Sequence, residues 1–148
     1  MKVVTFVCVS FACLAVPGTY LTRDQALEKV WGESELEKIQ KTDHTFYLSS
    51  NSADKSSASF HTQKVRSKSQ TIMLHVTEEG EIIDILLCKF KEPVKYKPSK
   101  KWLNQFIGKT LNEDLRLKRD IDGVSGATLT SRATVKSVRE ILTAHAEK

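Results

Sequence analysis

Cysteine is scarce in this sequence, and the few cysteines are unevenly placed. There are three, and two of them, Cys8 and Cys13, lie within the first 18 residues. The remaining chain has Cys88 alone, so it can form neither an internal disulfide nor a cysteine cluster that binds zinc or iron–sulfur. Any redox chemistry in this part of the chain therefore requires a bound organic cofactor.

The chain also lacks a hydrophobic run long enough to cross a membrane as a helix. Its longest uncharged apolar stretch covers residues 3–16 and ends at Pro17-Gly18. At about 14 residues it is short for a spanning helix and typical of a signal-peptide core. Val16 and Gly18 suit the −3 and −1 sites of signal peptidase. We therefore predict a signal peptide over residues 1–18 and an extracytoplasmic protein (periplasmic or at the cell surface, free or membrane-associated); a retained anchor or a buried strand are the alternatives.

Sequence motifs of the common enzyme classes are missing. There is no Gly-x-Gly-x-x-Gly, no P-loop, no nucleophile elbow and no His-Glu-x-x-His pair. The four histidines are dispersed, and Cys88 lies in an apolar run typical of a small buried residue. No general acid or base stands out, which favours a carrier or a binding module and leaves open whether the chain is itself an enzyme. The histidines are His44, His61, His75 and His145.

Composition indicates one globular domain. The chain has 148 residues, of which 40% are hydrophobic and 28% charged, enough for a single core. Loss of residues 1–18 takes one lysine from the formal charge of +5 and leaves +4. The positive charge alone would suit a nucleic-acid partner, but the predicted export argues against one. Six lysines between residues 89 and 101 indicate either a solvated surface or a docking face for an acidic partner or anionic lipid.

Hydrophobic periodicity predicts an α+β fold, with helices packed on an antiparallel sheet in one domain. The expected helices cover residues 22–31, with Thr22 and Gln25 as a capping box, then 33–39, 102–107, and a last helix capped by Thr130. The expected strands cover 44–48, 60–65, 71–76 and 82–87, the last two forming a hairpin around Gly80. Residues 51–59 are expected to form a loop.

The segment before the last helix has the properties of an anion site. Gly123, Gly126 and Ala127 let a ligand approach the backbone, and the following helix N-terminus favours a phosphate. Hydroxyl groups and Arg132 can add donors. A glycine turn followed by a capped helix is the simpler alternative. The hydroxyl residues are Ser125, Thr128, Thr130 and Ser131.

The run Asp122-x-x-Ser125-Gly126-Ala127-Thr128 resembles the flavinylation motif of the FMN-binding domain family. That family includes domains of the sodium-translocating NADH:quinone reductase and of the Rnf electron-transfer complex, and small exported stand-alone proteins. The similarity continues in residues 21–27, 90–93 and 102–109. Between Glu92 and Trp102 the chain departs from many relatives, which leaves the contacts at the flavin edge open.

The resemblance implies a covalent cofactor. In the family a separate flavin transferase, which requires a divalent metal, moves FMN from FAD onto the last motif residue as a phosphoester, here Thr128. Ser125, Gly126 and Ala127 would form the recognition turn, and Asp122 would assist the transferase or hold the turn. Thr130 and Ser131 would neutralise the phosphate. Tyr96, Trp102 and Phe106 would border the ring or pack in the core.

The resemblance also divides the chain and suggests what it does. It implies a signal peptide (1–18), an N-terminal helical segment (19–41) and an FMN-binding domain (42–148). The expected function is an exported electron-transfer module, matured by the flavin transferase and served by redox partner proteins, some of them membrane-bound. Two alternatives are a non-redox module that binds a phosphate ligand or flavin without a covalent bond, and a reductase of a small acceptor.

Overall fold

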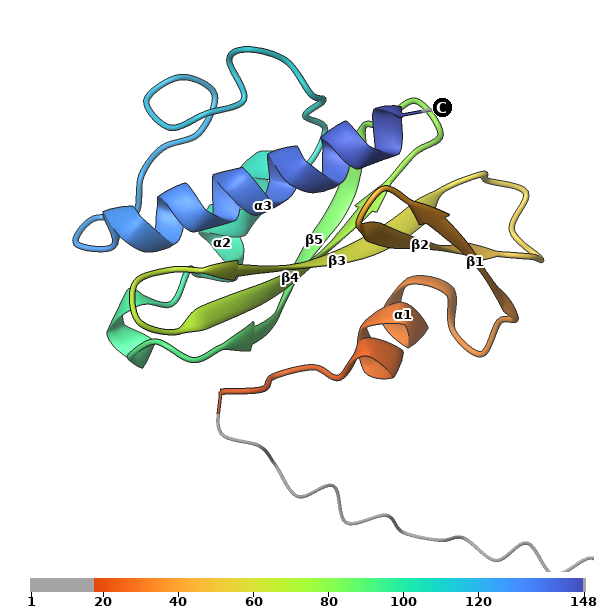
Figure 1. Cartoon of the computed structure of the whole chain (residues 1–148), viewed down its shortest axis with the longest axis horizontal. Helices are drawn as coiled ribbons and strands as arrows, with labels where there is room; N and C mark the ends of the chain where they lie inside the picture. The colour runs from red at the N-terminus through yellow and green to blue at the C-terminus, as the bar shows by residue number, and fades with distance from the viewer. Residues whose placement is uncertain (1–17, 148) are drawn as a thin grey trace, which may run out of the picture.

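Five strands that follow one another along the chain form one antiparallel sheet in the order β1-β2-β3-β4-β5 (Figure 1). The computed structural model describes residues 18–147. The strands are β1 (Leu36–Lys41), β2 (His44–Ser49), β3 (Ser57–Lys64), β4 (Ser69–Val76) and β5 (Ile82–Phe90). The helices are α1 (Arg23–Trp31), α2 (Lys100–Leu103), α3 (Thr128–Ala146) and two 3-10 turns, η1 (Val94–Tyr96) and η2 (Asn104–Phe106). The predicted α+β architecture is confirmed.

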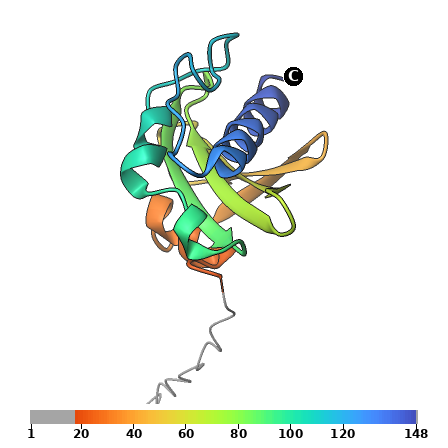
Figure 2. The same ribbon diagram turned by 90° about the vertical axis from the view of Figure 1, so that its left-hand side faces the viewer.

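Helices cover both faces of the sheet, as Figures 1 and 2 show. Side chains of a strand alternate between faces, and β4 shows this clearly. Ile72 and Leu74 point into the larger core beneath α3 and α2, whereas Met73 points into a smaller core beneath α1. Because both faces are covered, β4 carries consecutive buried apolar residues, Ile72, Met73 and Leu74.

The predicted hairpin is confirmed as β4 and β5, and the other predicted strands are also present. Gly80 in the hairpin turn has a φ of 86°, a value that glycine adopts without strain. The expected loop 51–59 is shorter than predicted, because β3 begins at Ser57 and pairs there with Leu48 and Val76. Strand pairing outweighs the low strand propensity of this serine-rich segment.

The predicted second helix at residues 33–39, and with it an all-helical 19–41 segment, is wrong. Residues 36–41 form β1, which pairs with β2 from Leu36↔Ser49 to Lys41↔His44. The Glu- and Lys-rich composition favoured a helix. The segment is an edge strand with mostly exposed side chains, so it lacks the apolar alternation that marks a strand, and its charges protect the open edge.

The first described residues are attached to the edge of β5. The Phe90 N–H donates to the Gly18 carbonyl at 2.7 Å, and the Tyr20 N–H donates to the Cys88 carbonyl at 2.8 Å. The capping box predicted for α1 is confirmed at Thr22 and Gln25. The predicted signal peptide lies outside the described residues except for Gly18. Within residues 18–147, none of the helices combines the length and the apolar character that membrane crossing requires.

Candidate functional site

Helix α3 begins at the motif threonine itself. Thr128 is its first residue and is exposed, while the N-cap residue Ala127 makes no side-chain capping bond. The predicted cap at Thr130 is therefore wrong, since Thr130 lies buried inside the first turn. The N–H groups of residues 128–130 have no partner in the described part of the chain. An exposed hydroxyl thus sits beside free N–H donors at the positive end of a helix of 19 residues.

A tight turn delivers the chain to this helix. The Ala127 N–H donates to the Val124 carbonyl at 3.0 Å, which closes a four-residue turn. Gly126 occupies its third position with a φ of 72°, a conformation that favours glycine there. A Cβ at Gly126 would meet no atom within 4 Å. The motif glycine is therefore explained by backbone conformation and not by lack of space.

Ser131 holds both ends of the turn. Its hydroxyl accepts from the Val124 N–H at 2.9 Å and donates to the Ala127 carbonyl at 3.1 Å. The side chain is fully buried, so its hydroxyl is already used within the protein. The structure thus places Ser131 behind the turn, whereas Ser125 and Thr128 are exposed in front of it.

The aromatic segment before the motif positions Asp122 through its backbone. The Trp102 indole N–H donates to the Asp122 carbonyl at 2.7 Å, and the Asp122 N–H donates to the Gln105 side-chain oxygen at 2.9 Å. The predicted helix 102–107 is instead the short α2 followed by η2. Trp102 and Phe106 are buried in the larger core, so they support the motif from behind. The Asp122 carboxylate has no hydrogen bond or ion pair within residues 18–147.

A cavity of about 670 Å³, here called the Tyr96 pocket, opens on one side of Thr128. It lies between the β3–β4 turn, η1 and the start of α3, and it has an apolar and aromatic part around Tyr96 and Leu129. Such a size and mixed lining are typical of a small-molecule site. Its lining residues are Val65, Arg66, Ser67, Lys68, Glu92, Pro93, Lys95, Tyr96 and residues 126–130. Of the three predicted aromatics, only Tyr96 lines it.

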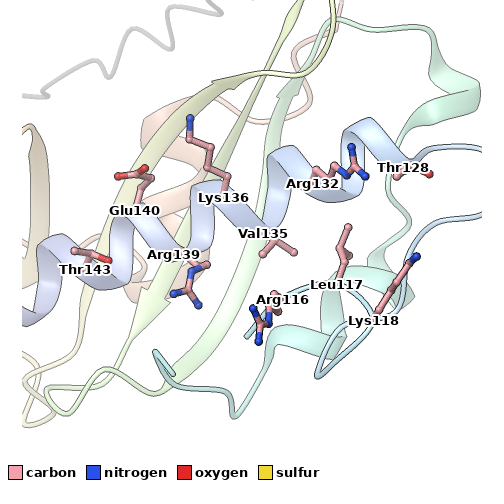
Figure 3. A pocket seen from close by; sticks show the side chains of 10 residues that line it. All are labelled: Arg116, Leu117, Lys118, Thr128, Arg132, Val135, Lys136, Arg139, Glu140 and Thr143. Atoms are coloured by element: carbon pink, nitrogen blue, oxygen red, sulfur yellow. The ribbon is translucent and has the colours of Figure 1, made fainter. Parts of the chain in front are cut away.

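A second cavity of about 750 Å³, here called the α3 groove, opens on the other side of Thr128 (Figure 3). It runs between α3 and the loop that contains Arg116 and Lys118, over an apolar floor of Leu117 and Val135. Its lining residues are Arg116, Leu117, Lys118, Thr128, Arg132, Val135, Lys136, Arg139, Glu140 and Thr143. Thr128 is thus the residue at which two cavities of different chemistry meet.

Glu92 shapes the wall of the Tyr96 pocket, a role that the sequence did not reveal. Its carboxylate accepts from the N–H groups of Lys68, Ser67 and Arg66 at 2.7, 2.9 and 3.2 Å. These bonds lower the pKa of the Glu92 carboxyl, and the bond from Lys68 contributes most. The Glu-Pro step at the end of β5 was recognisable in the sequence, but the turn it binds lies about 25 residues earlier in the chain.

We expect Glu92→Gln to lower the melting temperature at neutral pH. The variant keeps the shape of the side chain but loses the charge that three donors stabilise. Because the folded pKa is depressed, this stabilisation is complete above the unfolded pKa of about 4.3 and disappears as pH falls through the folded value. Melting curves of the two proteins from pH 3 to 8 should therefore converge in acid. The exposed Glu79→Gln is the control, and an equal effect of both variants would contradict the role of Glu92.

The remaining reactive side chains form no second centre. His44 and His61, which the sequence separates, contact each other across β2 and β3 at 2.9 Å, yet the described residues contain no group of three metal ligands. Cys88 is buried as predicted, and burial raises its pKa to about 11. A thiol with this pKa stays protonated and unreactive at neutral pH.

Comparison with known protein families covers this part of the chain. No curated protein matches the chain. The sequence model of the FMN-binding domain matches residues 66–143, more than half of the 148 residues. The match extends from the β3–β4 turn to the last turns of α3. It therefore includes the whole motif and Thr128, which lines both cavities. The chain therefore belongs to the FMN-binding domain family and is a flavoprotein.

Proposed function

We propose that the FMN is joined through its phosphate to Oγ of Thr128 and that the protein is an exported electron-transfer module. The observation that carries this proposal is the position of Thr128. It is an exposed hydroxyl on the first residue of α3, beside three free N–H donors and between two cavities. The residues fit a phosphate bound there, because the helix terminus and the N–H groups favour an anion.

Arg132 is the further phosphate partner that we assign. It lies four residues after Thr128, one helical turn away on the same face. Figure 3 shows its side chain directed toward the Thr128 end of α3. Ser131 is left out of this set, because its hydroxyl already serves Val124 and Ala127. Thr130 remains among the proposed phosphate partners, because it lines the Tyr96 pocket.

The Tyr96 pocket is our choice for the flavin ring. It offers an aromatic and apolar lining from Tyr96, Pro93 and Leu129, whereas half of the residues that line the α3 groove are cations and none is aromatic. Leu129 is 45% exposed, which is high for a leucine, and a ring in this pocket would cover it. When bound, the ring supplies one- and two-electron chemistry. The protein's own part is to hold it and keep an edge accessible.

Asp122 fits a role in maturation. Its backbone is fixed by Trp102 and Gln105, while its carboxylate is exposed and unpaired within the described residues. We therefore assign the carboxylate to the transfer reaction and the backbone to the shape of the loop. In that reaction the Thr128 Oγ–P bond forms, the pyrophosphate bond of FAD breaks, AMP leaves with the bridging oxygen, and the hydroxyl proton of Thr128 is released to the buffer.

The covalent bond is tested by co-expression with a flavin transferase, followed by denaturation. Flavin fluorescence on a denaturing gel, with a mass increase of one FMN less one water, supports the ester. Flavin that is lost on denaturation supports the noncovalent binding module instead. Electron transfer is then tested with the reduced, purified protein. With the same external reductant, a carrier turns over a small acceptor no faster than free FMN does, whereas faster, saturable turnover would indicate a reductase.

A further inference from the structure

The cations of the α3 groove have no ion-pair partners among residues 18–147. The carboxylates nearest in sequence to Arg116 and Lys118 are already paired, Asp114 with Arg119 at 3.7 Å and Asp120 with Lys109 at 3.9 Å. Arg139 donates to the carbonyls of Asn112 and Leu115. These bonds fix the position of its side chain, but the uncharged carbonyl groups do not neutralise its positive charge. In Figure 3 the one acidic lining residue, Glu140, points with Lys136 to the opposite side of α3 from Arg139. The groove is therefore an uncompensated positive site.

Charge is strongly segregated over the molecule. Without Lys2 and Lys148, residues 18–147 have 21 Lys and Arg and 18 Asp and Glu. The two cavities beside Thr128 contain eight of these cations and two of the carboxylates, a net charge of +6. The remaining 13 cations and 16 carboxylates sum to −3. Such asymmetry orients an approaching charged molecule and raises its association rate.

The lysine-rich stretch 89–101 is a weaker candidate for a docking face. Lys100 pairs with Asp84 at 2.8 Å. The ammonium groups of Lys97 and Lys95 lie 4.0 and 4.9 Å from the ring centroids of Tyr20 and Tyr96. Half of the six lysines are thus engaged within the protein, whereas among the five cations of the α3 groove only Arg139 makes side-chain hydrogen bonds within residues 18–147.

The shape of the groove indicates what kind of anion it receives. It follows one face of α3 from Thr128 to Thr143, a length of about 22 Å at 1.5 Å per residue. A concave site of this length suits a projecting acidic segment better than a flat bilayer surface. No aromatic side chain lines it, and aromatic stacking is how proteins usually hold single-stranded nucleic acid.

We propose that the α3 groove docks an acidic segment of a redox partner protein and so places the partner's redox centre beside Thr128. The inference rests on the proposed function, because the groove ends at the residue that would carry the flavin. Charge complementarity sets the partner's chemistry, and Arg116 and Lys118 lie on the side of the groove opposite α3, where a partner would meet them.

The test uses an acidic blue-copper protein as the probe and two matched double variants. Arg116→Glu with Lys118→Glu reverses the charge on one side of the groove. Lys29→Glu with Lys38→Glu makes the same change of net charge on α1 and β1. All four residues are exposed. In electron transfer, each fully reduced flavin reduces two Cu(II) ions to Cu(I), and its protons go to the buffer. At low salt we expect the groove variant to lose about 10-fold or more in rate, and the control much less.

Three results would overturn the docking proposal: equal losses in both variants, rates that do not fall with added salt, or a basic c-type cytochrome reacting faster than the copper protein with the wild type. Affinity of the flavin-free chain for the copper protein provides a separate measurement. If the groove determines this affinity but the chain never acquires covalent flavin on co-expression with the transferase, the docking site stands and the proposed function is refuted. Groove-dependent binding to anionic vesicles, with none to the copper protein, would identify a membrane site instead.

Discussion

Thr128→Ala is expected to abolish covalent flavin completely, while Thr128→Ser keeps it. Alanine has no oxygen to form the ester, whereas serine offers the same hydroxyl group at this position. The loss cannot be attributed to unfolding, because Thr128 is exposed and such surface substitutions usually change stability by about 0.5 kcal/mol or less. The measurement is in-gel flavin fluorescence and intact mass after co-expression with the transferase.

The same helix offers a matched control for this experiment. Thr143 is also exposed and also lines the α3 groove, about four turns after Thr128. Thr143→Ala should retain the full flavin content, since its hydroxyl has no helix N-terminus beside it. A flavin band in Thr128→Ala would move the attachment to another hydroxyl, with Ser125 the first to examine. No band in any of the proteins would leave noncovalent FMN binding as the function.

Much of the fold could be predicted from local pattern. The β-rich apolar runs of β4 and β5, the turn glycine at Gly80 and the capping box at Thr22 each encode their structure within a few residues. β1 could not be predicted, because only its pairing with β2 makes a strand of a charged segment. The start of α3 was misplaced for a similar reason, since Ser131 bonds backward to Val124 and Ala127 and no cap side chain is needed.

The candidate site was partly predictable. The motif pointed to Thr128, because its residue types and spacing are specific. The walls of the Tyr96 pocket come from segments that are distant in the sequence, the turn at 66–68 and the Glu92-Pro93 step. The α3 groove likewise joins Arg116 and Lys118 to charges that recur every three or four residues on α3. Neither cavity is visible until the sheet brings these segments together.

The anchoring of the motif gives the second large effect. Trp102→Ala should lower the free energy of unfolding by about 3–5 kcal/mol, the usual range for removing a buried aromatic side chain, because Trp102 is only 9% exposed and packs in the larger core. It should also impair flavinylation, since the indole N–H no longer holds the Asp122 carbonyl. Denaturant unfolding and the initial rate of flavin transfer measure the two effects.

Packing and positioning can be separated with two further variants. Trp102→Phe keeps most of the ring volume but loses the 2.7 Å bond to Asp122. This loss should lower the free energy of unfolding by about 0.5–1.5 kcal/mol. Leu103→Ala opens a cavity in the same core and should lower the free energy of unfolding by about 2–5 kcal/mol. It removes no hydrogen bond of the motif. If Trp102 positions the loop, Trp102→Phe slows flavin transfer more than Leu103→Ala does, although it is the more stable protein. If transfer rates follow stability instead, the indole serves the core alone, and the loop keeps its shape through Gln105, Ser131 and the Gly126 turn.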